Sequence, residues 1–314
     1  MKELQRVIGR YTGTQRGPLL IAIGGVHGNE PAGVLALEQM FDMLRMEPQQ
    51  NPQFHFSGRL LGLRGNLRAM REGKRFIHKD LNRQWTRENI ARIRASAPEQ
   101  RDAEDWELLE LTDIIEAEVA DYQPHKLVLL DFHTTTAYGG IFSIATNDPE
   151  SLRIAVELHA PVVTGLLDGI RGTSLHYFCQ DNFAPETVAV CFESGQHQEP
   201  LSVKRAIAAL TNCMRSIGCV RAQDVENRHD KLLIEYSTGL PKVAELIRIH
   251  SIRPEDDFEM VPGFKNFQAI HEGQLLARDR HGPIYAPQDG LILMPLYQPQ
   301  GEDGFFLIKK VEGY

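Results

Sequence analysis

The stretch of sequence that decides the fold reads Leu19-Leu20-Ile21-Ala22-Ile23-Gly24-Gly25-Val26-His27-Gly28-Asn29-Glu30-Pro31. Its apolar run is short and ends in glycines, which predicts a buried strand of a parallel sheet, and the proline is well placed to open a helix. His27 and Glu30 then fall in the turn between strand and helix. Ligands collect at the carboxyl ends of strands in open α/β sheets, because the loops diverge there. Imidazole and carboxylate groups are ordinary zinc ligands, so the turn predicts a metal site.

Taken alone, the His27/Glu30 pair is weak evidence for metal binding. The chain has 12 histidines and is rich in glutamate, so about one such spacing is expected by chance. The pair gains weight because it follows a predicted strand and because no other His-x-x-Glu spacing occurs in the sequence.

Composition and charge limit the kinds of function that the chain can have. With 314 residues, of which 42% are hydrophobic and 24% charged, it has a globular composition and is long enough for two domains. A formal charge of -8 argues against nucleic acid or an anionic membrane as the main partner. The N-terminus lacks a signal-peptide core, and no run of about 20 apolar residues could span a membrane. Four cysteines without a Cys-x-x-Cys pair favour reduced thiols. We therefore expect a cytoplasmic protein and leave open whether it forms a homo-oligomer.

Strands and helices alternate in the prediction up to residue 219. Apolar periodicity predicts helices over 34–44, 103–122 and 203–217, and apolar runs predict strands near 59–63, 126–133, 141–145, 162–165 and 187–193. Beyond them, short β-rich runs are separated by Gly, Pro and Asp turns. The predicted fold is α/β: a mostly parallel or mixed sheet with helices on both faces in residues 1–219, and a smaller all-β domain in 220–314 that covers the site.

Three predicted strands end beside groups that bind metals or transfer protons. His27 and Glu30 follow the first strand, His133 ends the second, and Glu193 ends the third. The ends of parallel strands share one edge of a sheet, so these groups are expected to meet there. Two histidines and a carboxylate are the protein's share of a catalytic zinc site, in which the pKa of a bound water falls to about 7. Glu193 would lie outside the ligand set and take the proton of that water.

Each of these residues also has a simpler interpretation. His133 could be a hydrogen-bonded histidine at a strand end, and Glu193 could form a surface salt bridge. Asp131 lies on the same face of its strand as His133 and could orient a histidine or bond to a helix. The basic stretch 64–85 reads mostly as a solvated loop.

Four blocks carry a resemblance to a known family: Gly25-Val26-His27-Gly28-Asn29-Glu30, Arg75-Phe76-Ile77-His78-Lys79-Asp80-Leu81-Asn82-Arg83, Asp131-Phe132-His133 and Phe192-Glu193-Ser194-Gly195. In this order they resemble the succinylglutamate desuccinylase and aspartoacylase family, whose catalytic domain is related to that of zinc carboxypeptidases. The resemblance covers the N-terminal two-thirds of the chain well and the C-terminal third loosely.

The resemblance implies a role for each matching residue. One zinc ion per chain would be held by His27, Glu30 and His133, with Glu193 acting as general base and then as general acid. Arg75 would polarise the scissile carbonyl, and a donor aimed at a developing oxyanion typically contributes about 3 kcal/mol.

Other matching residues would bind the substrate. Asn82 and Arg83 match the pair that binds the α-carboxylate of the substrate. A guanidinium can bind a carboxylate through two parallel hydrogen bonds. Tyr297 is a loose match to a tyrosine that reaches the substrate. The segment 134–140, Thr-Thr-Thr-Ala-Tyr-Gly-Gly, lacks the arginine of the succinylglutamate-type enzymes. Arg171 is the nearest candidate to bind a second carboxylate of the substrate. The resemblance therefore does not identify the acyl group or the amino acid.

The predicted function is therefore a zinc-dependent amidohydrolase that removes the acyl group from a small, anionic N-acyl amino acid. One rival is a carboxypeptidase-like enzyme, which would use the same groups on peptide C-termini. Another is a non-catalytic protein that binds a small ligand or a partner. A serine hydrolase is disfavoured, because the sequence has no Gly-x-Ser-x-Gly elbow.

Overall fold

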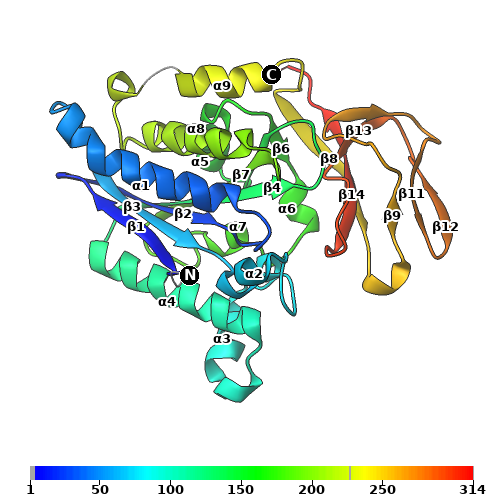
Figure 1. Cartoon of the computed structure of the whole chain (residues 1–314), viewed down its shortest axis with the longest axis horizontal. Helices are drawn as coiled ribbons and strands as arrows, with labels where there is room; N and C mark the ends of the chain where they lie inside the picture. Colours follow the sequence, from blue (N-terminus) through cyan, green and yellow to red (C-terminus); the bar gives the residue numbers. More distant parts are fainter. Residues whose placement is uncertain (1–3, 226–227, 314) are drawn as a thin grey trace.

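The computed structural model describes residues 4–225 and 228–313, so the first three residues of the N-terminus lie outside it (Figure 1). Within the described residues, one 11-stranded mixed sheet runs through the molecule. In spatial order its strands are β1 (Val7–Thr12), β3 (Ser57–Arg64), β2 (Gln15–Gly24), β4 (Lys126–Thr135), β7 (Glu186–Gln196), β5 (Phe142–Ala145), β6 (Val162–Thr164), β8 (Val243–Ser251), β14 (Asp303–Lys310), β13 (Gly290–Leu293) and β10 (Gln268–Ile270).

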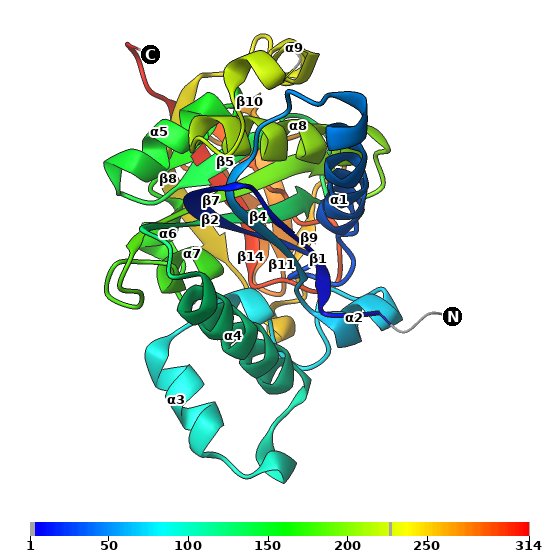
Figure 2. The same cartoon turned by 90° about the vertical axis from the view of Figure 1, so that its left-hand side faces the viewer.

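Helices cover both faces of the part of this sheet that contains β1 to β7 (Figures 1 and 2). On one face lie α1 (Ala32–Gln50), α5 (Pro149–Glu157), α8 (Leu201–Ser216) and α9 (Arg228–Tyr236). On the other lie α4 (Ala103–Tyr122) and α7 (Ser174–Tyr177), with α2 (Leu67–Glu72) and α3 (Arg87–Ala95) packed on α4. The short helix α6 (Leu166–Gly169) contacts β8.

Strand β2 is buried from both sides, which is why its sequence is almost continuously apolar. Leu20 and Ala22 belong to the core that α1 and α8 close, whereas Leu19, Ile21 and Ile23 belong to the core beneath α4. All five residues are 0% exposed. Burying a leucine or isoleucine side chain fully stabilises the fold by about 1.5–3 kcal/mol, so this strand fixes the centre of the sheet.

Two glycines let helix α1 begin directly against the strand ends. A Cβ on Gly24 would lie 2.5 Å from the backbone nitrogen of Val34, and one on Gly33 would lie 2.5 Å from Cβ of Phe132. Neither distance is possible for real side chains, so helix and strands can approach this closely only with glycine. The contact holds the turn with His27 and Glu30 beside the end of β4.

The fold class predicted from the sequence is confirmed. Strands β2, β3, β4 and β7 are mutually parallel, while β1 and β5 add antiparallel pairs, so the sheet is mixed. The helix predicted over 103–122 has those bounds, and the helices predicted from 34 and 203 extend to 32–50 and 201–216. The sequence did not indicate β1, α3, α5 or α9, and part of the stretch read as a basic loop forms α2.

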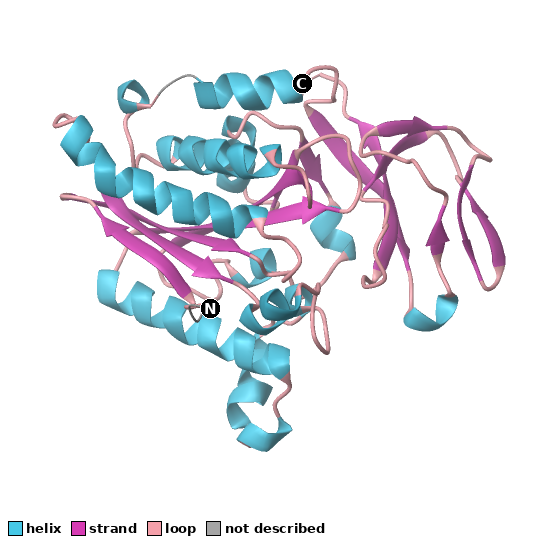
Figure 3. Ribbon diagram, in the orientation of Figure 1, coloured by secondary structure: helices cyan, strands magenta, loops and turns pink. Residues whose placement is uncertain are grey.

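Antiparallel strands dominate the C-terminal third, at the right of Figures 1 and 3, as the sequence predicted. Strands β8, β14, β13 and β10 extend the large sheet, because β8 pairs with β6. A second sheet contains β12 (Gly282–Tyr285), β11 (Leu275–Asp279) and β9 (Glu259–Met260). The domain boundary at residue 219 stays a prediction. No helix in the described part of the chain has the length and apolarity to cross a membrane.

Candidate metal centre and active site

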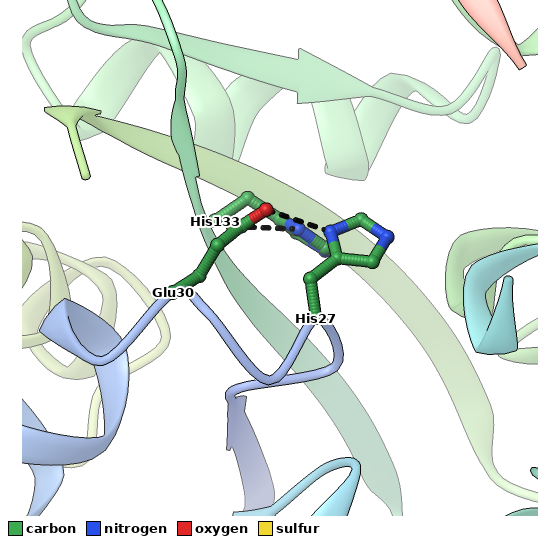
Figure 4. A group of neighbouring side chains, drawn as sticks. All are labelled: His27, Glu30 and His133. Carbon is green, nitrogen blue, oxygen red and sulfur yellow. Dashed lines mark hydrogen bonds and ion pairs between the residues drawn. The ribbon is translucent and has the colours of Figure 1, made fainter. Parts of the chain in front are cut away.

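His27, Glu30 and His133 gather at the carboxyl edge of the parallel strands (Figure 4). Nδ1 of His27 lies 2.8 Å from Oε1 of Glu30, and Nδ1 of His133 lies 3.3 Å from Oε2 of the same carboxylate. One donor atom from each residue lies within 4.8 Å of the other two, and all three side chains are buried. The three residues therefore form a possible metal site.

The second nitrogen of each imidazole is held by an aspartate. Nε2 of His27 lies 3.1 Å from Oδ1 of Asp80, and Nε2 of His133 lies 3.2 Å from Oδ2 of Asp131. Carboxylates in this position fix the tautomer and orientation of metal-binding histidines and raise their basicity. The orienting role considered for Asp131 matches this contact, but Asp80 received no role from the sequence. Its only signal was its place two residues before Asn82.

Charge at the site favours a cation. Burial alone would raise the pKa of Glu30, but His27 and His133 hold it well below its usual range. Burial would likewise raise the pKa of Asp80, and Arg75 and His27 hold it well below its usual value. Although burial lowers the pKa of His133, Asp131 and Glu30 raise it well above its usual value. Two carboxylates that stay ionised beside two imidazoles fit a divalent ion such as zinc, which would take the place of the proton on His133.

Glu193 lies directly opposite His133, because the two residues are partners in the β4–β7 register. Its side chain is buried and lines the same cavity as the metal-site residues, and its Oε2 atom has no hydrogen-bond partner among the described residues. Burial raises its pKa to about 8. An unpaired carboxylate oxygen in a cavity is suited to accept a proton from a small molecule bound there.

Arg75 is oriented by the same aspartate that holds His27. Its Nε and Nη2 atoms donate to Oδ2 of Asp80 at 3.1 and 2.9 Å, and its Nη1 atom lies 3.7 Å from Oε1 of Glu30. Burial lowers the pKa of the guanidinium, but Asp80 and Glu30 outweigh this and raise it above its usual value. A permanent positive charge therefore faces the cavity beside the metal site.

Asn82 and Arg83 line the cavity next to these groups. The Asn82 side chain accepts a hydrogen bond from the backbone N–H of Ser174 at 3.0 Å, and its Nδ2 atom lies 3.5 Å from Nε2 of His133. The Arg83 guanidinium donates to Asp303 at 2.7 Å. The cavity that these residues share has an empty volume of about 890 Å³, part of it open to solvent, which is in the range of small-molecule sites.

Two predicted substrate-binding residues do not line this cavity. The Arg171 side chain is exposed, although its neighbour Ile170 lines the cavity. The Tyr297 hydroxyl donates to the carbonyl of Val261 at 2.9 Å and accepts from the backbone N–H of Phe264 at 2.8 Å. The roles of all the named site residues stay predictions, and those of Arg171 and Tyr297 would require their side chains to move.

His197 is a further cavity residue that the sequence did not indicate. Its Nδ1 atom lies 2.6 Å from Oγ1 of Thr134, and its Nε2 atom is buried without a hydrogen-bond partner among the described residues. It follows the end of β7, where no motif signals a site.

Comparison with known proteins gives consistent matches. The family model for the succinylglutamate desuccinylase/aspartoacylase catalytic domain matches residues 16–217. A probable aspartoacylase of Nostoc sp. is 32% identical over 137 residues, 43% of this chain and 42% of that protein. The aligned region thus spans less than half the length of this curated relative.

Solved structures share the fold. Succinylglutamate desuccinylase from Vibrio cholerae aligns with a TM-score of 0.63 and 19% identity, over 94% of this chain and 82% of that one. The ectoine utilization protein EutE (DoeB) from Ruegeria pomeroyi, in a product-bound structure, aligns with a TM-score of 0.64 and 18% identity, over 96% and 88% of the two chains.

Proposed function

The chain belongs to the succinylglutamate desuccinylase/aspartoacylase family, and from this premise we propose that it is a zinc-dependent deacylase of small N-acyl amino acids. One observation supports the proposal most directly. A single cavity is lined by three kinds of group. They are the buried carboxylate of Glu193, whose Oε2 atom has no partner among the described residues, the largely buried guanidinium of Arg75, and the possible metal site of His27, Glu30 and His133.

In the proposed reaction, some residues bind and polarise the substrate and another transfers the proton. Asn82 and Arg83 bind the carboxylate of the substrate, which places the amide between Arg75 and Glu193. Arg75 donates hydrogen bonds to the carbonyl oxygen as negative charge develops there. Zinc, when bound by His27, Glu30 and His133, supplies a Lewis acid that polarises the carbonyl and lowers the pKa of water.

Glu193 moves the proton in this scheme. It accepts a proton from water as the oxygen of that water attacks the carbonyl carbon, and then gives the proton to the amide nitrogen. The carbon–nitrogen bond breaks, and a carboxylic acid and a free amino acid leave. The low dielectric that raises the pKa of Glu193 also makes the carboxylate a stronger base towards water.

The position of the C-terminal third favours a small substrate over a peptide. Met294, Leu296, Gln298 and residues 301–303 line the cavity together with the metal-site residues. Gln300 accepts a hydrogen bond from the backbone N–H of Arg75 at 3.1 Å, so this segment is attached to the catalytic side. A carboxypeptidase needs room for a peptide, which would have to pass this segment.

The test is an assay of zinc-loaded protein with N-acetyl and N-succinyl amino acids, in which hydrolysis is measured as release of the free amine. Glu193→Gln should keep one zinc per chain and lose activity by about 10²–10⁴-fold, the usual contribution of a general base. Glu245→Gln, at an exposed pair with Lys309 of 3.5 Å, is the matched control and should behave as wild type. Unchanged turnover in Glu193→Gln would remove Glu193 from the mechanism.

A further inference from the structure

The cavity is lined by both polar and apolar side chains. The polar ones include the metal-site residues, Arg75, Asn82, Arg83, Glu193, His197, Gln298, Glu302, Asp303 and four threonines. Nine further lining side chains are apolar or weakly polar, and we call them the apolar wall. They come from β5, α6, the loop and helix that follow it, β7 and the C-terminal third: Ile144, Leu166, Leu167, Ile170, Leu175, Cys191, Met294, Leu296 and Phe306. The mechanism above uses none of them.

Part of this wall is built into the segment that supports the carboxylate-binding pair. Gly172 packs against Arg83 so closely that a Cβ there would lie 2.3 Å from the Arg83 carbonyl oxygen. The backbone N–H of Ser174 donates to the Asn82 side chain at 3.0 Å. Ile170 and Leu175 flank these two contacts and line the cavity. Ile170 and Leu175 of the wall are therefore adjacent to the groups that would bind the substrate carboxylate.

We propose that the substrates are N-acyl derivatives of amino acids with apolar side chains, a conclusion that rests on the proposed deacylase function. The α-carbon of such a substrate carries both the carboxylate and the side chain, whereas the acyl group lies across the amide bond. A wall beside the carboxylate-binding pair thus receives the side chain of the amino acid. Leucine, methionine and phenylalanine side chains match its chemistry.

Charge in the cavity disfavours an acidic side chain. Among the described residues that line it, Arg75 and Arg83 are the only lysine or arginine side chains. Arg83 already pairs with Asp303 at 2.7 Å and lies 3.6 Å from a carboxylate oxygen of Glu302. A second substrate carboxylate would find no lysine or arginine side chain on the wall. Its desolvation would then have no compensating ion pair.

The first experiment compares substrates with the full-length, zinc-loaded protein. Values of kcat/KM for N-acetyl-leucine, N-acetyl-methionine and N-acetyl-phenylalanine should exceed those for N-acetyl-aspartate and N-succinyl-glutamate by about 100-fold or more, because each methylene in an apolar pocket contributes about 10–200-fold. Equal or faster hydrolysis of the acidic substrates overturns this inference and leaves the deacylase function standing. Hydrolysis of none of the panel overturns both.

The second experiment locates the side-chain site. Leu167→Gln, at a half-buried position, should lower kcat/KM for N-acetyl-leucine at least tenfold and leave that for N-acetyl-glycine, which has no side chain, within about twofold. Ile170→Arg should shift the ratio of N-acetyl-aspartate to N-acetyl-leucine towards the acidic substrate. Ile234→Arg, at an exposed position on α9 that is 51% accessible, is the control. Unchanged substrate ratios in both wall variants, with wild-type zinc content and thermal unfolding, overturn the assignment.

Discussion

Asp80→Asn tests whether one buried carboxylate organises both the metal site and the oxyanion donor. Asp80 lies 3.1 Å from Nε2 of His27 and accepts hydrogen bonds from Arg75 at 3.1 and 2.9 Å and from the backbone N–H of Asn82 at 2.8 Å. Its side chain is 0% exposed. The asparagine keeps the shape but removes the charge, and its amide group cannot accept hydrogen bonds on the side that loses an oxygen.

The size of the effect follows from these contacts. Loss of a carboxylate behind a metal-binding histidine typically weakens metal binding by about 10–100-fold, or about 1.4–2.8 kcal/mol at 1.4 kcal/mol per tenfold. Arg75 also loses its fixed orientation. We therefore expect kcat with saturating zinc to fall by about tenfold or more. This loss should be smaller than the loss of about 10²–10³-fold that follows complete removal of an oxyanion donor.

The assay is competition for zinc with a chromogenic chelator, together with kcat at saturating metal. Asp230→Asn is the control, because Asp230 accepts from Arg215 at 3.0 and 2.8 Å on the far helices and should change neither quantity. A folded Asp80→Asn protein whose zinc affinity and kcat both lie within a factor of two of wild type would refute the orienting role.

Three further changes test the packing and the buried charges. Gly33→Ala should destabilise the protein by about 1–3 kcal/mol in urea unfolding, because its methyl group would collide with Phe132; wild-type stability would contradict the close approach. Glu199→Ala should cost about 3–5 kcal/mol, because Arg205 is 0% exposed and would lose its partner at 2.7 Å; a cost below about 1 kcal/mol would show that the pair is not needed. Burial raises the pKa of Glu107, but the adjacent arginines outweigh it and lower the pKa below its usual value. Its stabilisation is therefore present above its unfolded pKa and lost as the pH falls through the folded value. The free energy of unfolding, measured in urea at several pH values between about 5 and 3, should fall more steeply with pH for wild type than for Glu107→Gln. Equal slopes for the two proteins would contradict a stabilising role of this carboxylate.

The centre of the fold was predictable because its signals are local. The run Leu19–Ile23 is apolar at every position, as a strand buried on both faces requires, and two other apolar runs end in ionisable residues. Parallel strands bring such ends to one edge whatever the loops do, so the sequence predicted that His27, Glu30, His133 and Glu193 lie along one edge. That they line one cavity also depends on β4 lying between β2 and β7, which the sequence did not indicate.

What could not be predicted depends on distant contacts. The loop that carries Asp80 owes its conformation to Glu104, a 0% exposed residue of α4 that accepts hydrogen bonds from the backbone N–H groups of residues 77–79. No pattern within the loop indicates that partner. Tyr297 likewise follows β13 in an irregular segment, and its hydroxyl bonds to backbone far along the chain.

The most direct measurement is the number of zinc ions per chain by native mass spectrometry, for wild type and for the double variant His27→Ala/His133→Ala. The metal centre described here predicts one ion bound to wild type and none to the variant under the same zinc concentration. Wild type that stays metal-free in excess zinc, or a variant that still binds one ion, would contradict it.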